Sequence, residues 1–581
     1  MKLIFKIKKQ FIFILTILTV SISCNDSFLE VPPTGSLANA QLATKSGIEG
    51  VLIGAYGALN GVFGSRFEGP NHWVTGSIMG GDANKGTDAG DYSSINPIQR
   101  YETPTNDNDL NNLWRGRYEG VNRCNTVLRL LNEATDITPA DADRIAGEAR
   151  LLRGHFYFDL KKHFNSIPYF DETVTPVDIA LITNSPDVWS QIEADFQFAF
   201  DKLPSTQAQA GRVNKWAAAA YMGKALLYQQ KYADALTWFN SVMTNGETTN
   251  GLKYALLDNY ADIYNAENDN HAEAIFDVES SNNSGSTQNA NYFDDLNYPY
   301  NTGLDGPGNC CGFFQPSFEL ANSFRTDVNG LPLLDGSYND AANELVTDYL
   351  VESTAAFTPD ANPLDPRIDH SIGRRGIPYL DWIAHPGKDW IRSQAYAGPY
   401  SPKKYVYYKS QENSFTDGSS WTRGYATMNY TIIRYADVVL MAAEAEIEAG
   451  SLENARALIN QVRTRAANST FWVKDDLGND AANYVIDTYN TAFANKTEAT
   501  TALRMERKLE LSGEGHRFFD LVRWGIADQV LNDYLGHENA AGLVTKFGGA
   551  KFTAGKNEFY PIPQTQIDIQ GAAILQQNPG Y

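Results

Sequence analysis

The sequence predicts a mainly α-helical fold, in which tetratricopeptide-like helical hairpins form a scaffold with large irregular loop insertions and few short strands. Two stretches, residues 211–243 and 434–466, each have apolar residues at helical spacing on both sides of a short turn. Between them, residues 281–430 are rich in Gly, Pro, Asn, Asp and aromatic residues, which is typical of loops. We therefore expect one compact structural unit overall.

The N-terminus has the layout of an export signal. Four lysines precede an apolar run over Phe11–Val20, and Cys24 follows two small serines. We expect residues 1–23 to be a lipoprotein signal peptide, and Cys24 to become the acylated first residue of the mature chain. A secreted protein cut near the same place is the alternative. Residues 24–40 are then a lipid-anchored tether.

The mature chain is strongly acidic. The formal net charge is −22, and removing residues 1–23 deletes four lysines and no acids, which brings it to −26. Nucleic acid is a poor partner for such a chain, because its phosphates require a basic face. Neutral ligands and cationic partners remain open. No later apolar run has the length of a transmembrane helix.

The N-terminal region, residues 41–280, is predicted to be helical with tetratricopeptide-like hairpins. Ala235 and Phe239 have the spacing that such a repeat uses in its second helix, within the hairpin 211–243. Further helices are predicted at residues 41–60, 110–131, 146–164 and 188–203, and the last two form a candidate third hairpin.

Residues 61–108 interrupt this helical region. They contain eight glycines and show little periodicity, so we expect a long functional loop. The stretch from Asp82 to Asp88 resembles a calcium loop only faintly, because Ser93 stands where the bidentate Glu belongs. No metal site is expected.

Aromatic residues in polar loop segments are the candidate ligand-binding residues. A sugar ring stacks its apolar face on Trp or Tyr, while its hydroxyl groups need amide, carboxylate or guanidinium partners. For each aromatic residue the alternative is packing in the core. The candidates, with their polar neighbours, are Arg66, Asn71, Trp73, Asp82, Tyr92, Tyr292, Tyr298, Tyr300, Trp382, Trp390 and Trp421; Arg374 and Arg375 lie near them in sequence.

Three cysteines remain after the anchor. Cys310 and Cys311 are adjacent, closer than ordinary disulfide geometry favours. In an oxidising compartment they could still form a vicinal disulfide, which we favour. One of them pairing with Cys124, or all three remaining reduced, are the alternatives.

The C-terminal region, residues 431–581, contains a charged helix–turn–helix from Met505 to Gly525. Gly513 and Gly515 are predicted to break the first helix, as is usual where the backbone needs positive φ. Charges interleaved with aromatics predict a buried structural network that locks the two helices together. Its members are Glu510, Glu514, Arg517, Asp520 and Arg523.

No catalytic motif is present in the sequence. It contains no His-Glu-x-x-His, Gly-x-Ser-x-Gly, Walker or Cys-x-x-Cys pattern, so an enzyme and a cofactor are not expected. A glycoside-active enzyme is the weaker alternative, since a pair of carboxylates suffices for that chemistry.

Several stretches resemble the SusD/RagB family of surface glycan-binding lipoproteins of Bacteroidetes-type bacteria. The charged helix–turn–helix at Met505–Gly525 closely resembles one near the C-terminus of that family. The Pro-Ser-x-x-Leu-x-x-x-Phe pattern at 316–324, Asp365-Pro-Arg and the terminal stretch 560–581 are also similar. Similar runs occur in the tether, at Asn122–Asn125 and at Glu148–Leu160, so the similar stretches together span nearly the whole mature chain in the family's order.

The resemblance implies a function at the cell outer membrane, lipid-anchored and facing outward. It implies a protein that captures oligosaccharide or polysaccharide and delivers it to a SusC-like TonB-dependent transporter, without breaking bonds. A helical face would lie against the barrel, and loops 61–108 and 281–430 would hold the ligand. A peptide-binding RagB-like lipoprotein and a structural lid with little affinity are the alternatives.

Overall fold

The computed structural model describes residues 39–308, 310–419 and 423–581. The predictions for the signal peptide, for most of the tether, for Cys24 and for Trp421 lie outside the described residues.

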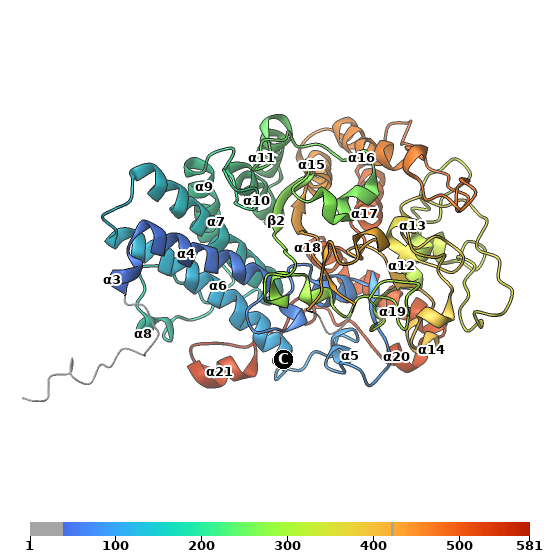
Figure 1. The fold of residues 1–581 in the computed structure, drawn as a ribbon, viewed down its shortest axis with the longest axis horizontal. Helices are drawn as coiled ribbons and strands as arrows, with labels where there is room; N and C mark the ends of the chain where they lie inside the picture. The colour runs from blue at the N-terminus through green and yellow to red at the C-terminus, as the bar shows by residue number, and fades with distance from the viewer. Residues whose placement is uncertain (1–38, 309, 420–422) are drawn as a thin grey trace, which may run out of the picture.

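Long helices pack side by side and form the frame of the molecule (Figure 1). Along the chain, α6 contacts α7, α7 contacts α9, α9 contacts α10, and α10 contacts α11. Helix α11 then packs against α15, although residues 246–434 separate them in sequence. The array is therefore continuous across the insertion. Its helices are α4 (Lys45–Gly57), α6 (Asn108–Glu133), α7 (Pro139–Phe164), α9 (Trp189–Lys202), α10 (Lys215–Tyr228), α11 (Tyr232–Asn245), α15 (Tyr435–Ala449), α16 (Leu452–Ala466) and α17 (Lys496–Glu510).

The predicted hairpins are present as α10–α11 and α15–α16. The Asn214 side chain accepts hydrogen bonds from the first backbone N–H groups of α10, which fixes where that helix begins. Gly223 allows α11 to approach closely, because a Cβ atom there would lie 2.5 Å from the Phe239 ring. The helical predictions for residues 211–243 and 434–466 are confirmed.

Short antiparallel strand pairs join segments that are distant in sequence. β2 (Ala274–Val278) pairs with β8 (Tyr430–Arg434), with Ala274 opposite Arg434, and closes the insertion at its base. β1 (Ala83–Gly86) pairs with β3 (Phe313–Pro316) and joins loop 61–108 to the insertion. Two further pairs lie inside the insertion: β4 (Ile372–Gly373) with β5 (Ser401–Pro402), and β6 (Thr416–Asp417) with β7 (Tyr425–Ala426). The predicted helical fold with few short strands is confirmed.

Loop 61–108 is more ordered than its sequence predicted. It contains a π-helical turn at Trp73–Ile78, strand β1 and the short helix α5 (Ile95–Ile98). Among the described helices, none combines the length and the apolar character needed to cross a bilayer. The remaining helices are α3 (Asn39–Leu42), α8 (Pro176–Ile179), α12 (Phe318–Ser323), α13 (Ile368–Ser371), α14 (Gln394–Ala397), α18 (Arg517–Arg523), α19 (Ala527–Ala540), α20 (Val544–Phe547) and α21 (Gln564–Gln570).

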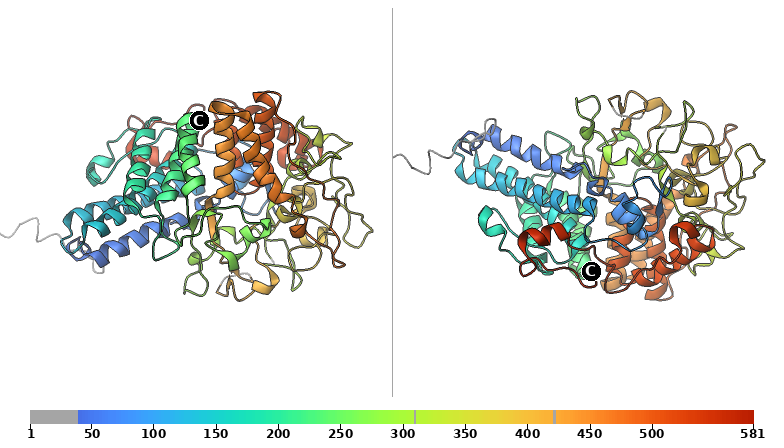
Figure 2. Two further views of the ribbon diagram at one scale, coloured as in Figure 1. Left: turned by 90° about the horizontal axis from the view of Figure 1, so that it is seen from above. Right: turned by 90° about the horizontal axis from the view of Figure 1, so that it is seen from below.

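The loops of the insertion gather at one end of the molecule, beside the helical frame (Figure 2). One hydrophobic core runs through the helices and the base of the insertion. A separate aromatic-rich cluster, which we call the insertion cluster, lies within the insertion. It consists of Tyr298, Tyr379, Trp382, Trp390, Val406, Tyr407 and Ala426. The loops thus have a small core of their own.

A buried ion network joins the end of α17 to the insertion and to β8. Glu510 contacts the guanidinium groups of Arg367, Arg434 and Arg465, at 3.0 Å for Arg367 and 2.7 Å for Arg434. Glu514 contacts Arg434 and Lys404, each at 2.8 Å. Burial opposes the ionisation of Glu514, but these cations outweigh it and lower its pKa to about 2. The network therefore holds both carboxylates in the charged form.

A second branch of charges joins α17 and α18 to α15. Asp520 lies 2.8 Å from Arg507 and 2.8 Å from Arg523, and Arg523 also binds Glu444 of α15. Arg517 differs from the prediction, because no carboxylate among the described residues lies within 4.0 Å of it. Its stem packs against Gly80 instead.

We expect the folded protein to be strongly destabilised when one charge of the buried network is removed and its partners remain. Glu510→Gln leaves three buried guanidinium groups short of a counter-charge, so we expect the free energy of unfolding to fall by about 3–5 kcal/mol. Urea denaturation followed by circular dichroism measures this. Glu453→Gln, an exposed carboxylate on α16 paired with Arg456, is the matched control and should leave the midpoint unchanged. Equal midpoints for the two variants would show that the network adds no stability.

Candidate functional site

Loop 61–108 and the insertion meet and form one surface. Arg66 binds Asp295 through two nitrogens, with Nη2 at 2.6 Å from Oδ2. Asn71 donates a hydrogen bond to Asp294 Oδ1 at 2.5 Å. Together with the pairing of β1 and β3, these contacts fix both loop segments relative to each other.

Seven of the predicted binding residues are buried, either at this junction or in the insertion cluster. Trp73 is fully buried, packs edge-on against Phe313, and donates its indole N–H to the Phe293 carbonyl at 3.0 Å. Core packing, the alternative raised for each aromatic residue, is what the structure shows for these positions. As candidate ligand-binding residues these positions are corrected, because their side chains are nearly inaccessible to a ligand. The seven are Asn71, Trp73, Asp82, Tyr292, Tyr298, Trp382 and Trp390, all at most 9 % exposed.

Asp82 has a structural role at the turn after α17. Its Oδ2 accepts a hydrogen bond from the Gly513 backbone N–H at 3.0 Å. Burial raises the pKa of Asp82 to about 6, although the nearby Arg517 charge acts in the opposite direction. Gly513 and Gly515 have φ angles of 73° and 79°, which glycine adopts without strain, so Asp82 binds a turn that these two glycines make possible.

Arg374 and Arg375 are also structural. Arg374 binds Asp369 at 2.6 Å, and both side chains are buried. Arg375 donates hydrogen bonds to backbone carbonyls of residues 352–355. Neither guanidinium is free to bind a ligand in this arrangement.

Tyr92 and Arg66 lie at the half-buried margin of the junction. Tyr92 packs edge-on against Phe313, with ring centroids 6.4 Å apart. Burial, together with the negative charge of Asp109, raises the pKa of the Tyr92 hydroxyl. The hydrogen bond between this hydroxyl and the Asp109 carboxylate helps to fix the Tyr92 ring at the margin.

Tyr300 and Arg392 form a second aromatic–guanidinium pair. The Arg392 guanidinium lies 5.4 Å from the centroid of the Tyr300 ring. Asp88 and Asp91 of loop 61–108 bind the same guanidinium, at 2.9 Å and 2.5 Å. Arg392 therefore bridges the two loop segments and covers an aromatic ring at the same time.

The cysteine pair lies beside Tyr300. Cys310 and Cys311 are joined by a disulfide, and Cys124 is a buried free thiol. The Cys311 N–H donates to the Leu296 carbonyl at 3.3 Å, and the Gly312 N–H to the Tyr298 carbonyl at 2.9 Å. The disulfide is thereby held against the segment that carries Tyr300.

Trp382 forms a third pair at the edge of the insertion cluster. It is 8 % exposed, and its indole N–H donates to the Tyr407 carbonyl at 3.2 Å. The Arg423 guanidinium and the Lys409 ammonium lie 5.4 Å and 5.8 Å from its ring centroid. Glu412 binds Arg423 at 2.6 Å. Trp382 therefore has two cationic side chains against its ring, and Glu412 orients one of them.

These three pairs define a surface that we call the loop face: Arg66, Tyr92, Tyr300, Trp382, Arg392 and Arg423. Its guanidinium side chains are 21–31 % exposed, and each is held by at least one carboxylate. The sequence analysis identified four of these residues and missed Arg392 and Arg423. Their only sequence signal is a basic residue within two or three positions of a tryptophan, which is too common to be selective.

A buried acid lies beneath the loop face. Asp294 accepts hydrogen bonds from the Asn71 and Asn297 amides, and its Oδ2 has no hydrogen-bond partner among the described residues. Burial raises the pKa of Asp294 to about 7, although both amides oppose this shift. A protonated carboxyl group, which carries no charge, fits this environment.

One group of described side chains has the spacing of metal ligands: His72, Asp159 and His163. Arg117 and Lys162 bind the same Asp159 carboxylate, the latter at 2.8 Å. Burial, the largest influence, lowers the pKa of His163 to about 3. Two cations already compensate the single acid, so these residues do not fit a divalent ion. They form a buried polar cluster between α7 and loop 61–108.

Two family models match the chain. One, described as the SusD family, matches residues 272–581. The other, described as starch-binding associating with outer membrane, matches residues 28–227.

Individual relatives match over most of their length. SusD-like protein P25 of Formosa agariphila is 25 % identical over 546 residues, which cover 90 % of this chain and 92 % of that protein. Starch-binding protein SusD of Bacteroides thetaiotaomicron is 23 % identical over 481 residues, which cover 78 % and 75 %. The fold is similar to that of a solved structure, surface glycan-binding protein A from Bacteroides thetaiotaomicron in complex with laminarihexaose. The TM-score is 0.64 and the sequence identity is 19 %, and the match covers 92 % of this chain and 99 % of that chain.

The raised pKa of Asp294 predicts a pH-dependent stability. An unfolded Asp titrates near 3.9, so between about pH 4 and pH 7 the folded chain binds more protons than the unfolded chain. The contribution of Asp294 to the free energy of unfolding therefore falls as pH rises through this window. Asp294→Asn has no proton to lose, so we expect it to be more stable than wild type by about 2–4 kcal/mol at pH 8 and nearly equal at pH 4.

Urea denaturation at both pH values measures this difference. Asp389→Asn, a change of an exposed carboxylate in the same insertion, is the control, and its stability relative to wild type should be the same at both pH values. A variant at position 294 that is destabilised equally at pH 4 and pH 8 would mean that the buried acid is ionised.

Proposed function

The chain belongs to the SusD family, and we propose that it is a surface lipoprotein that captures oligosaccharide or polysaccharide and delivers it to a SusC-like TonB-dependent transporter. In this proposal loop 61–108 and the insertion hold the ligand. The helical regions, residues 41–280 and 431–581, provide the surface that meets the transporter. No bond of the ligand is broken.

The observation that carries the proposal is the loop face. Aromatic rings lie there beside guanidinium groups whose position is fixed by carboxylates. A sugar ring can stack on such an aromatic residue, and its hydroxyl groups accept hydrogen bonds from the guanidinium N–H groups. Because carboxylates already balance each guanidinium charge, the face favours a neutral glycan over an acidic one.

The related proteins guide the choice of ligand to test. Their names mention starch and laminarihexaose, which are both built from glucose. Neutral glucans are therefore the first probes for this chain. Peptide binding is the competing function, because the acidic chain would suit cationic peptides.

The loop face predicts which residues matter for ligand binding. Tyr300→Ala and Arg392→Ala should each weaken binding of the glycan at least about tenfold, because each removes one partner of a stacked pair. Isothermal titration against a polysaccharide panel, followed by any oligosaccharide that binds, measures this effect. Arg456→Ala on α16, which removes a guanidinium paired with Glu453, is the matched control and should bind as wild type does.

Trp382→Ala is the third variant of this series. This variant should also bind the glycan more weakly. If its melting temperature equals that of wild type, a ligand contact has been lost; if the melting temperature falls, the change has disrupted the insertion cluster. Wild-type affinity in all three variants would refute the loop face as the binding site. Binding of a peptide mixture in place of every glycan would support the peptide-binding alternative.

We also propose that Cys24 carries the lipid anchor on the outer face of the outer membrane. The signal layout of residues 1–23 supports this, as does the family model described as associating with outer membrane. Several acyl chains bind a bilayer stably, because each buried CH₂ contributes about 0.8 kcal/mol.

Cys24→Ala should abolish labelling with a radioactive fatty acid and move the protein out of the outer-membrane fraction. Retained labelling would show that another residue is acylated. The proposed partner can be tested by affinity purification of the wild-type protein after extraction in mild detergent. A TonB-dependent barrel should copurify with it. If no such barrel copurifies, the proposed partner is contradicted.

A further inference from the structure

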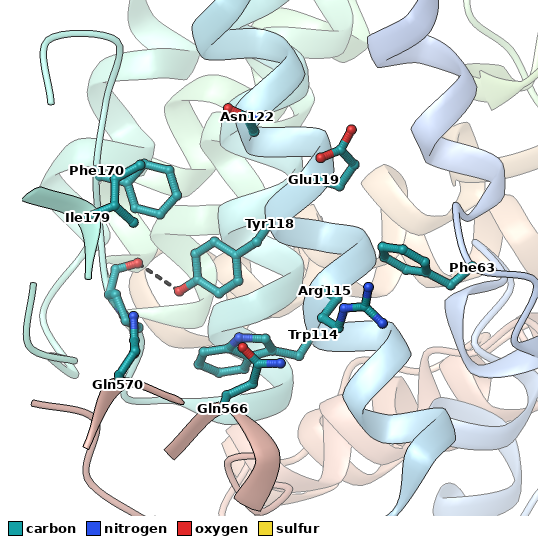
Figure 3. Close-up of a pocket in the computed structure, with 11 residues that line it drawn as sticks. Phe63, Trp114, Arg115, Tyr118, Glu119, Asn122, Phe170, Ile179, Gln566 and Gln570 are labelled. Carbon is teal, nitrogen blue, oxygen red and sulfur yellow. Dashed lines mark hydrogen bonds between the residues drawn. The ribbon is translucent and has the colours of Figure 1, made fainter. Parts of the chain in front are cut away.

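A separate pocket lies on the helical side of the molecule, away from the loop face. It has a volume of about 390 Å³, within the range of roughly 300–1,000 Å³ that is usual for small-molecule sites. Figure 3 shows Trp114, Arg115 and Tyr118 projecting from α6, with Gln566 and Gln570 reaching toward them from α21. None of these residues was among the predicted binding residues.

The aromatic floor of this pocket is fixed before any ligand arrives. The Tyr118 hydroxyl donates to the Pro168 carbonyl at 2.8 Å, as the dashed line in Figure 3 shows. The Tyr118 ring is stacked on Phe170, with an interplanar angle of 13° and centroids 5.7 Å apart. The Trp114 ring is only 4 % exposed and supports Tyr118, with the two ring centroids 5.0 Å apart. Rings held in this way lose little conformational entropy on binding.

The rim supplies hydrogen-bonding groups that the fold leaves unused. The Gln570 Oε1 atom is buried and has no hydrogen-bond partner among the described residues. Arg115 is exposed, and among the described side chains no carboxylate lies within 4.0 Å of its guanidinium. The guanidinium stacks on the Phe63 ring, 4.0 Å from its centroid. The buried Gln570 Oε1 atom lacks a donor, and the Arg115 guanidinium has N–H groups available, so both groups favour a polar ligand in this pocket.

We propose that this pocket is a second glycan-binding site, which holds one sugar ring beside the partly exposed Tyr118, between Gln570 and Arg115. The sugar hydroxyl groups donate to Gln570 Oε1 and accept from the Arg115 guanidinium. An apolar side chain of a partner protein fits less well, because it would leave the Gln570 carbonyl buried without a donor. The site extends the proposed function to a second place on the same chain, so one long glycan could bind at both.

The test uses the full chain, purified in detergent, with laminarihexaose and maltohexaose as probes. The pocket variant combines Arg115→Ala with Gln570→Ala, and the loop-face variant combines Tyr300→Ala with Arg392→Ala. Arg129→Ala, about 21 Å further along α6 than Arg115, is the matched control. Isothermal titration gives the number of sites and the affinity of each, and thermal melting shows that each variant is folded.

We expect two glycan-binding sites in wild type and in the control. Each double variant should keep one site at wild-type affinity and lose at least tenfold in affinity at the other, altered site. A pocket variant that keeps two sites overturns the inference, while a loop-face variant that keeps two sites contradicts the proposed function instead. If the wild-type chain binds neither oligosaccharide at millimolar concentration, the result contradicts both the second site and the proposed function.

A second measurement does not depend on the pocket variant. Phe63 is 40 % exposed at the mouth of the pocket, so Phe63→p-benzoylphenylalanine places a photoreactive group there. Irradiation with laminarihexaose or maltohexaose should attach the oligosaccharide covalently in the loop-face variant, where only the pocket can bind. Failure to crosslink with either probe, in a variant that still binds it, would also overturn the inference.

Discussion

The carboxylates at the end of α17 depend on cations that come from three other parts of the chain. Glu510 meets Arg367 of the insertion, Arg434 of β8 and Arg465 of α16, all nearly inaccessible to solvent. A buried charge without its partner costs several kcal/mol, so none of these segments can take its place alone. The insertion and the helical array are therefore stable only together, which makes the loops part of the folded unit rather than an appendage.

This dependence explains how irregular loops can present a defined surface. The pairing of β1 with β3 and the Arg66–Asp295 contact hold loop 61–108 against the insertion, and the insertion cluster supports Trp382 from below. A surface that is ordered in the free protein loses less entropy when a ligand binds. The loop face gains its preorganisation from contacts that lie outside it.

Helices were predictable from the sequence because their periodicity is local. The hairpins at residues 211–243 and 434–466 follow from apolar spacing and turn residues alone. Exposure was not predictable in the same way. Trp73 is buried because Phe293 and Phe313, more than two hundred residues away, cover it, whereas Tyr300 stays at the surface in a segment of similar composition. The position of the Arg392 side chain is fixed by Asp88 and Asp91, which lie about three hundred residues earlier in the chain. A local sequence pattern cannot identify partners so far away.

The antiparallel pairing of β2 with β8 brings the entry and exit of the insertion side by side, with Ala274 opposite Arg434. For the helical array, a segment of about 150 residues therefore behaves as a single surface loop between neighbouring helices. The entropy of closing a loop grows only with the logarithm of its length, about 0.6 kcal/mol for each doubling. Segments that keep the buried Arg367 guanidinium against Glu510 could differ widely elsewhere in length and composition without moving α11 or α15. Such an architecture lets ligand preference diverge while the frame that supports it stays the same.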